Sequence, residues 1–267
     1  MTATIAPRRG ASFVPAACDV ALRTLRKFAR TPQLIVVGTI QGAMFLLIFR
    51  YVFGGAIASG GLRYVDFLVP GFVTTGVLFT GTGASAGIAE DVDSGFFDRL
   101  RSLPIPRSSV IAGRVLADTG MLVWTTAATT AIGFAIGFRI HGGAVAALAA
   151  FGLCIVFGFT FFWLFMLLGL VAGNAQAAQG MSLLVFPLSF ISSAYVPVRT
   201  MPGWMQAFAR NQPITFMVDA VRRLADGNAA GALVRHSTSY EVTGALLWCV
   251  VLIAVFAPLG VAKFRRG

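Results

Sequence analysis

The chain has 267 residues, of which 57% are hydrophobic and 12% are charged, and its mean hydropathy is +0.81. Soluble domains carry about 25% charged residues, so this composition excludes a soluble protein and indicates an integral membrane protein. The net charge of +11 does not indicate nucleic-acid binding, because the cations lie beside apolar runs rather than on one groove-sized face.

Residues 1–32 are predicted to be a cytoplasmic tail followed by an amphipathic helix over 14–31 that Pro32 ends. The apolar side of this helix holds Val14, Ala17, Ala21, Leu25 and Phe28, and the basic side holds Arg23, Arg26, Lys27 and Arg30. We expect the helix to lie flat on the inner leaflet, where anionic lipid contributes about 1 kcal/mol per nearby cation. A plain topology signal made by the positive residues is the alternative.

Residues 33–267 are predicted to form one all-α transmembrane domain. Six apolar runs are long enough to cross a bilayer, at about 34–53, 65–89, 115–138, 145–172, 178–198 and 242–262. Arg50, late in the first run, is expected to reach the outer headgroups. Asp66 and Asp118 lie near the ends of their runs. The absence of an acid at mid-membrane disfavours a proton- or sodium-coupled carrier.

A compact charged block, residues 90–104, connects the second and third runs. If it is helical from about Val92, one apolar stripe contains Val92, Phe96, Leu100 and Leu103, while Asp91, Asp98, Arg101 and Ser102 face elsewhere. Pro104 and Pro106 are expected to stop this helix. We interpret the block as a docking surface for a soluble partner, and a purely structural loop as the alternative, because amphipathicity alone only marks an interface.

The segment before the last run, residues 199–241, is too long and too apolar for a simple turn. Ile214, Val218, Val221 and Leu224/Ala225 make a helical stripe, and Gly227 is placed as its C-terminal stop. We expect one or two short helices in the outer interface, and a re-entrant segment that dips into the membrane is left open. A solvated extracellular loop is the alternative.

With six crossings, the positive-inside rule places both termini in the cytoplasm. This orientation counts Arg222 and Arg223 among the outer cations. Cys18, Cys154 and Cys249 imply no disulfide framework, and His141 and His236 are expected to be surface residues without a metal. Neither Lys27 nor Lys263 follows a glycine-rich phosphate loop, so any ATP-driven work needs another subunit.

Two motifs resemble the membrane subunits of ABC-2-type exporters and, within them, the daunorubicin-resistance permeases of actinobacteria. The first inner loop, residues 95–107 followed by 113–118, is similar to that family's first cytoplasmic loop in residue type and spacing. The outer stretch 211–214 followed by 220–222 resembles the segment that such permeases carry before their last span. The likeness covers nearly the whole chain.

The resemblance implies a six-span half-transporter in the plasma membrane, paired with a second permease subunit, identical or paralogous, and with two ATP-binding-cassette subunits. ATP and Mg would be bound by those subunits, so no cofactor is expected in this chain. The N-terminal helix and the first inner loop would contact the ATPase. The implied contact residues are Arg23, Arg26, Lys27, Glu90, Asp93, Phe96, Asp98, Arg99, Leu100, Arg101, Leu103 and Pro104.

For the cargo path, the resemblance implies the face where spans two and five of the two halves meet. The residues on that face mix aromatic rings with hydroxyls: Phe72, Thr74, Thr75, Phe79, Thr82, Phe186, Ser189, Phe190, Ser192, Ser193 and Tyr195. Such a lining suits amphipathic molecules, whereas ordinary helix packing by small and hydroxyl residues is the alternative.

The function expected is therefore export of a drug-like or lipid-like amphiphile, energised by ATP hydrolysis in a separate chain. A stand-alone carrier or channel and a non-transporting membrane assembly protein are the alternatives.

Overall fold

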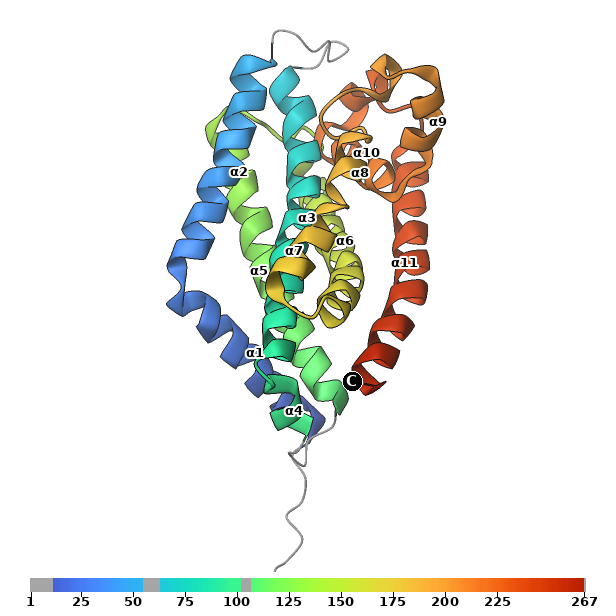
Figure 1. Cartoon of the computed structure of the whole chain (residues 1–267). Coiled ribbons are helices and arrows are strands. Elements are labelled where there is room, and N and C mark those ends of the chain that lie inside the picture. Colours follow the sequence, from blue (N-terminus) through green and yellow to red (C-terminus); the bar gives the residue numbers. More distant parts are fainter. Residues whose placement is uncertain (1–11, 55–62, 102–106, 267) are drawn as a thin grey trace, which may run out of the picture.

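The structure is a computed structural model that describes residues 12–54, 63–101 and 107–266. Every regular element in these ranges is a helix, as expected from the composition. In Figure 1 the long helices run roughly side by side, with α1 and α4 at one end of the bundle and α9 and α10 at the other. We call these the α4 end and the α9 end.

The N-terminal helix α1 (Phe13–Arg30) agrees with the predicted range, and Thr31 separates it from α2 (Pro32–Val52), which begins on a proline. The sequence predicted an apolar side facing the inner leaflet, and the structure shows in addition which residues pack on protein. Ala16, Ala17, Val20, Ala21 and Thr24 are buried against α5, whereas Val14 is 66% exposed and Leu25 is also exposed. Ala17 and Ala21 of the predicted apolar stripe thus pack on protein, whereas Val14 and Leu25 remain exposed.

The close contact between α1 and α5 depends on Gly113. A Cβ at this position would lie 2.7 Å from the Cβ of Val20 and closer still to the carbonyl of Ala17. Only glycine lets the two backbones approach this far without a shift.

The charged block does not form one helix from Val92. Helix α3 (Tyr64–Asp93) continues through Val92, the chain turns at Ser94 and Gly95, and α4 (Phe96–Arg101) follows. Gly95 has a φ of 65°, which residues with a side chain rarely adopt, so the helix breaks there. Leu103 and the two prolines predicted to stop the helix lie outside the described residues.

Helices α5 (Arg107–Ala135), α6 (Gly143–Val171) and α11 (Thr238–Arg266) correspond to three further predicted runs. Helix α6 packs on α3 to form the main core, which includes the fully buried Phe67, Phe157 and Phe165. Helix α11 packs on α6 and α10.

The fifth predicted run, 178–198, is not one continuous helix. It is divided into α7 (Ala175–Leu183) and α8 (Phe186–Phe190), and the chain from Ile191 to Pro197 is irregular. Asn174 caps α7 by accepting a hydrogen bond from the backbone N–H of Ala177 at 2.8 Å. Pro187, which lacks an N–H, lies in the first turn of α8, where that donor is not needed.

The segment before the last run holds η1 (Val198–Thr200), α9 (Gly203–Asn211), α10 (Pro213–Asp226) and η2 (Gly227–Ala232). The predicted stripe is confirmed for Ile214, Val218, Val221 and Ala225, which are buried, and Gly227 ends α10. Because α10 packs on α3, α6 and α11, it is part of the bundle rather than a solvated loop.

Three described helices are long and apolar enough to cross a bilayer: α3, α6 and the Thr238–Arg265 part of α11. A shorter apolar stretch, Gly38–Val52, lies within α2. Helix α5 is equally long, but Arg114, Asp118 and several threonines make it more polar. The chain is thus a multi-helix membrane protein.

Candidate functional site

The α4 end brings together three segments that the sequence predicted to act together. The Lys27 ammonium on α1 donates to the Glu90 carboxylate near the end of α3 at 2.8 Å. The Arg23 guanidinium lies 3.6 Å from the centroid of the Phe96 ring, the first residue of α4. Helix α1 is therefore linked directly to both α3 and α4.

Below this surface lies a buried charge cluster. The Arg114 guanidinium donates to Asp91 at 2.7 Å, to Asp118 at 2.9 Å and to the Ala84 carbonyl at 3.2 Å. All three charged side chains are buried, so they must satisfy one another. Arg23 also lies 3.8 Å from Asp91, which connects the exposed and buried layers.

The expectation that Asp91 faces away from the packed side was wrong. Because α3 continues past Val92, Asp91 points into the bundle toward Arg114. The spacing of Arg114 and Asp118, four residues apart on one helix, was a readable signal for a pair. Asp91, the third member of the cluster, could not be predicted from the sequence, because the position of the helix break decides which way its side chain faces.

The other predicted contact residues have different surroundings. Arg26, Asp93 and Arg99 are exposed, whereas Asp98, Leu100 and Arg101 belong to α4. Leu103 and Pro104 lie outside the described residues. Next to Phe96, Phe97 is buried edge-to-face against Phe264 of α11, with centroids 5.3 Å apart. Helix α4 thus packs on the bundle through one ring and contacts α1 through the other.

The predicted cargo-path residues divide into a buried group and an accessible group. Phe72, Thr74, Thr75, Ser189, Ser192, Ser193 and Tyr195 are buried. Their hydroxyls bond within the chain, for example Thr75 Oγ1 with the Tyr195 hydroxyl at 2.8 Å.

Phe79 and Phe190 are exposed, by 38% and 41%, and Thr82 and Phe186 are partly exposed. Phe79 and Phe186 meet edge-to-face at 4.8 Å, which joins α3 to α8. The accessible group is therefore an aromatic surface, and Phe79, Thr82 and Phe186 also line a small pocket of about 10 Å³.

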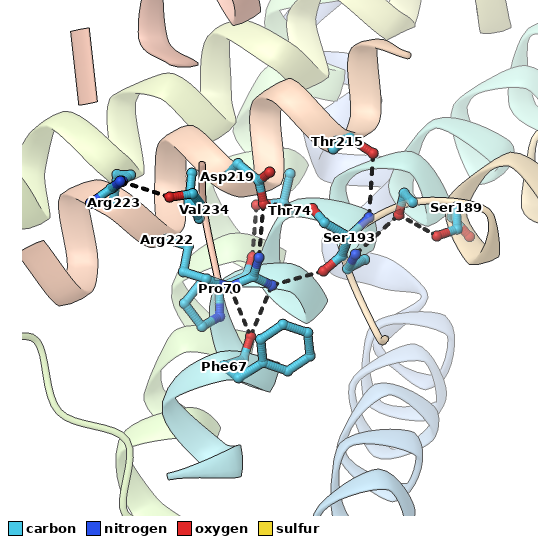
Figure 2. A network of polar contacts seen from close by, with 12 residues as sticks. Phe67, Pro70, Thr74, Ser189, Ser193, Thr215, Asp219, Arg222, Arg223 and Val234 are labelled. Atoms are coloured by element: carbon cyan, nitrogen blue, oxygen red, sulfur yellow. Dashed lines mark hydrogen bonds and ion pairs between the residues drawn. The ribbon is translucent and has the colours of Figure 1, made fainter. Parts of the chain in front are cut away.

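Toward the α9 end, a second polar network surrounds Arg222 (Figure 2). Its guanidinium donates to the Phe67 carbonyl at 3.1 Å, to the Ser193 carbonyl at 2.9 Å and to Asp219 at 2.9 Å. Ser193 donates to the same carboxylate at 2.7 Å. Arg222 thus joins α10 to α3 and to the segment after α8.

Arg222, which was counted among the outer cations, is a buried side chain rather than a loop cation, because it is only 1% exposed. Its principal partners are backbone carbonyls that lie 155 and 29 residues away in the sequence. Local sequence patterns carry no signal for such contacts. The helical stripe placed α10 against the bundle, yet it did not show which polar side chain entered with it.

Residues 19–224 match the family of membrane domains described as ABC-2 type transporter. The chain belongs to this family. The ABC-2 chain is 34% identical over 245 residues to the daunorubicin resistance ABC transporter permease protein DrrB1 of Streptomyces coeruleorubidus, covering 91% of this chain and 84% of the relative.

More distant relatives agree. Identity is 24% over 251 residues to the protein named probable doxorubicin resistance ABC transporter permease protein DrrC of Mycobacterium tuberculosis, covering 92% and 86% of the two chains. It is 26% over 201 residues to the inner membrane transport permease YadH of Escherichia coli, covering 71% and 74%.

These similarities identify the ABC-2 chain as a membrane permease subunit of an ABC exporter. Such a subunit works with an ATP-binding-cassette partner. Among the described residues, His, Cys, Asp and Glu form no cluster that could hold a metal ion.

Proposed function

We propose that this permease is a six-span half of an exporter that moves a drug-like or lipid-like amphiphile outward, using ATP hydrolysed by separate subunits. The observation that carries the cargo class is the 34% identity, over 91% of the chain, to a permease named for daunorubicin resistance. The aromatic surface of Phe79, Phe186 and Phe190 supports an amphiphilic cargo, because flat rings bind such molecules without requiring a charge.

The proposed topology has six crossings: α2, α3, α5, α6, the α7–α8 pair and α11, following a cytoplasmic tail and interfacial helix in residues 1–32. Both termini would be cytoplasmic, in a multi-pass plasma-membrane protein. A helical path from Ala175 to Phe190 covers about 24 Å at 1.5 Å per residue, short of the roughly 30 Å of hydrocarbon. The buried segment Ser192–Tyr195 would complete the crossing, since irregular backbone is tolerated inside a membrane where protein covers it.

The proposed ATPase contact is the surface of α1, α4 and the end of α3, and it includes the full predicted set from Arg23 to Pro104. The exposed cation Arg26 and the exposed acid Asp93 support this proposal, as charged side chains at the surface can contact a partner. Two ATP-binding subunits, carrying ATP and Mg, would bind two permease subunits.

The proposed cargo path follows the face of α3 and α7–α8, opposite a second permease subunit. The accessible residues Phe79, Thr82, Phe186 and Phe190 would contact cargo, while the buried hydroxyl residues behind them would set the shape of the wall. This division follows from exposure, because a fully buried side chain reaches cargo only after the helices move apart.

Transport in inverted membrane vesicles tests the function. With the permease and its ATP-binding partner present, daunorubicin used as a probe amphiphile should accumulate on adding ATP, and accumulation should persist when an ionophore collapses the ion gradients. Loss of accumulation with the ionophore, while ATP is maintained, would favour a stand-alone carrier.

The docking surface has its own test. Changing Asp98 and Leu100 to alanine together should reduce both co-purification of the ATPase and export. The matched control is Phe208→Ala with Arg210→Ala, two exposed residues on α9 at the opposite end. Undiminished binding after the α4 changes, or an equal loss in the control, would refute docking on α4.

The orientation can be tested with a natural cysteine. Cys18 is exposed on α1, whereas Cys154 and Cys249 are buried. A membrane-impermeant maleimide should therefore label Cys18 in inverted vesicles and leave it unlabelled in intact cells. The reverse pattern would place α1 and α4 outside and remove the basis of the docking proposal.

A further inference from the structure

A groove with a volume of about 630 Å³ lies among α5, α6 and α11 at the α4 end. Its wall is apolar and aromatic, and includes Ile111, Val115, Phe159, Trp163 and Phe264. The volume lies within the range of about 300–1,000 Å³ that is usual for small-molecule sites. The groove does not include the proposed cargo face, which lies on α3, α7 and α8.

The groove lies beside the α4 end of the bundle. Its lining covers residues 111–116 of α5, 159–163 of α6 and 261–265 of α11, which is about 6–8 Å along each helix axis. Arg265, in the last turn of α11, lies at the end of this lining. The groove is therefore long enough for the part of an acyl chain nearest to the headgroup.

Charge indicates what fills the groove. Arg265 is exposed, and none of the described residues that line the groove carries a carboxylate. An apolar helix from a second copy of the chain would cover Arg265 without giving it a partner, which is costly in a low-dielectric environment. A ligand with an apolar chain and an anionic head satisfies both parts of the site.

We propose that this groove binds an anionic phospholipid of the leaflet at the α4 end, with one acyl chain between α5, α6 and α11 and the phosphate at Arg265. The Trp163 indole, which also lines the groove, would lie along the acyl chain. The proposal does not depend on the identity of the exported cargo.

The headgroup, rather than the chain, should decide which lipid is held. Bilayer hydrocarbon is as apolar as the groove wall, so burying an acyl chain there gives little preference over bulk lipid. One cation near the membrane surface attracts an anionic lipid with a free energy of about 1 kcal/mol. This free energy corresponds to about a fivefold preference for an anionic lipid over a zwitterionic one. The site should therefore distinguish phosphatidylglycerol from phosphatidylcholine.

The first test measures lipid retained by the full-length permease in complex with its ATP-binding partner. The complex is reconstituted in bilayers of equal phosphatidylglycerol and phosphatidylcholine, extracted, and analysed by native mass spectrometry. Phosphatidylglycerol should be retained about fivefold over phosphatidylcholine, and Arg265→Gln should remove this preference. Lys263→Gln is the matched control, because Lys263 is exposed on the same turn of α11 but does not line the groove.

The second test locates the lipid. Phosphatidylglycerol with a photoreactive group on its acyl chain should label peptides of α5, α6 and α11 around the groove. Ala112→Phe fills the groove from α5 and should abolish this labelling, whereas Ala127→Phe, at an exposed position on the same helix, should not. If Ala112→Phe does not fold, the Arg265→Gln result still decides the proposal.

Several results would overturn the proposal. Equal retention of the two lipids would show ordinary annular lipid, and an equal effect of the Lys263 and Arg265 changes would show diffuse electrostatic attraction. Crosslinks between groove residues of two permease copies would show that protein covers the groove. None of these readouts depends on export, so the lipid site and the proposed transport function can fail independently.

Discussion

Arg23 on α1 covers the ring of Phe96 on α4, with its guanidinium carbon 3.6 Å from the ring centroid. In the sequence, Arg23 precedes α2 and α3, whereas Phe96 follows them. In the fold, the two residues lie on one surface. A cation over an aromatic face contributes about 0.5–1 kcal/mol at an exposed site, which is enough to bias how α4 is presented to a partner.

We therefore predict energetic coupling between these residues in ATPase binding. Arg23→Ala and Phe96→Ala should each weaken binding of the ATP-binding subunit, and the double change should cost less than the sum by about 0.5–1 kcal/mol. Arg26→Ala provides the comparison, because Arg26 is exposed on the same helix and its effect should add to that of Phe96→Ala. Binding affinities measured by titration provide the test, and strict additivity for the Arg23 pair would contradict it.

A second prediction concerns the contact of α1 with α5. Gly113→Ala places a methyl 2.7 Å from the Cβ of Val20, so α1 must shift, at a cost of about 1–3 kcal/mol. Gly120→Ala, on the same helix, meets only the flexible end of Leu25 at 3.3 Å, and its greater helix propensity contributes up to about 1 kcal/mol.

In detergent, the apparent melting temperature of Gly113→Ala should therefore be lower than that of the natural chain, whereas that of Gly120→Ala should be unchanged or higher. Maleimide reactivity of Cys18, which lies on α1, should change only in Gly113→Ala. Equal stabilities would show that α1 is not held by this contact.

The buried cluster around Arg114 leads to a third prediction. Arg114→Leu leaves Asp118 buried without a cation and Asp91 with only the 3.8 Å contact to Arg23, which should cost about 3–5 kcal/mol. Replacing both acids with asparagine in the same chain removes the unpaired charges and should recover most of the loss. Melting temperature and the yield of monodisperse protein measure this, and a triple variant as unstable as Arg114→Leu would count against a purely electrostatic origin.

The fourth prediction is a pH dependence at the end of α10. Burial raises the pKa of Asp226 to about 7, with Asp66 adding to the rise and Arg222 and His141 opposing it. The folded protein therefore binds this proton over a pH range in which the unfolded chain, with an Asp pKa near 4, has released it. The sign follows: the stability contributed by Asp226 should be fully present below about pH 4 and should be lost as pH rises through about 7.

Asp226→Asn cannot ionise and should lose this part of the pH dependence, becoming more stable than the natural chain at pH 8 by about 2 °C or more in apparent melting temperature. Because the His141 imidazole lies 3.6 Å from the Asp226 carboxylate, His141→Asn is the control. If Asp226→Asn leaves the pH profile unchanged, the carboxyl is not the titrating group.

Much of the architecture could be predicted from the sequence, because the apolar composition indicates that the helices are surrounded by lipid rather than by water. Long uncharged runs require helices that satisfy their own backbone in lipid, and α6 agrees with such a run at both ends to within two residues. The α10 stripe was also readable, since Ile214, Val218 and Val221 follow helical spacing and are buried together.

The fine polar geometry could not be predicted in the same way. Arg222 resembles an outer loop cation until the α3 carbonyl that accepts from it is known, and nothing near it in sequence indicates that partner. The fifth run shows the reverse case, because its apolar composition was read correctly while its helix is broken after Leu183. Hydropathy predicts that a segment lies in the membrane, but it does not predict whether the segment forms one unbroken helix.

Helix α11 is fixed at its two ends by aromatic pairs. Phe264 meets Phe97 of α4 at one end, and Tyr240 meets Phe216 of α10 at the other, with centroids 6.1 Å apart. Between these points most of its apolar window faces away from the protein. Helix α11 thus contacts α4 at one end and α10 at the other, and it also packs on α6, so a displacement of α4 would be felt by α10 through a single helix.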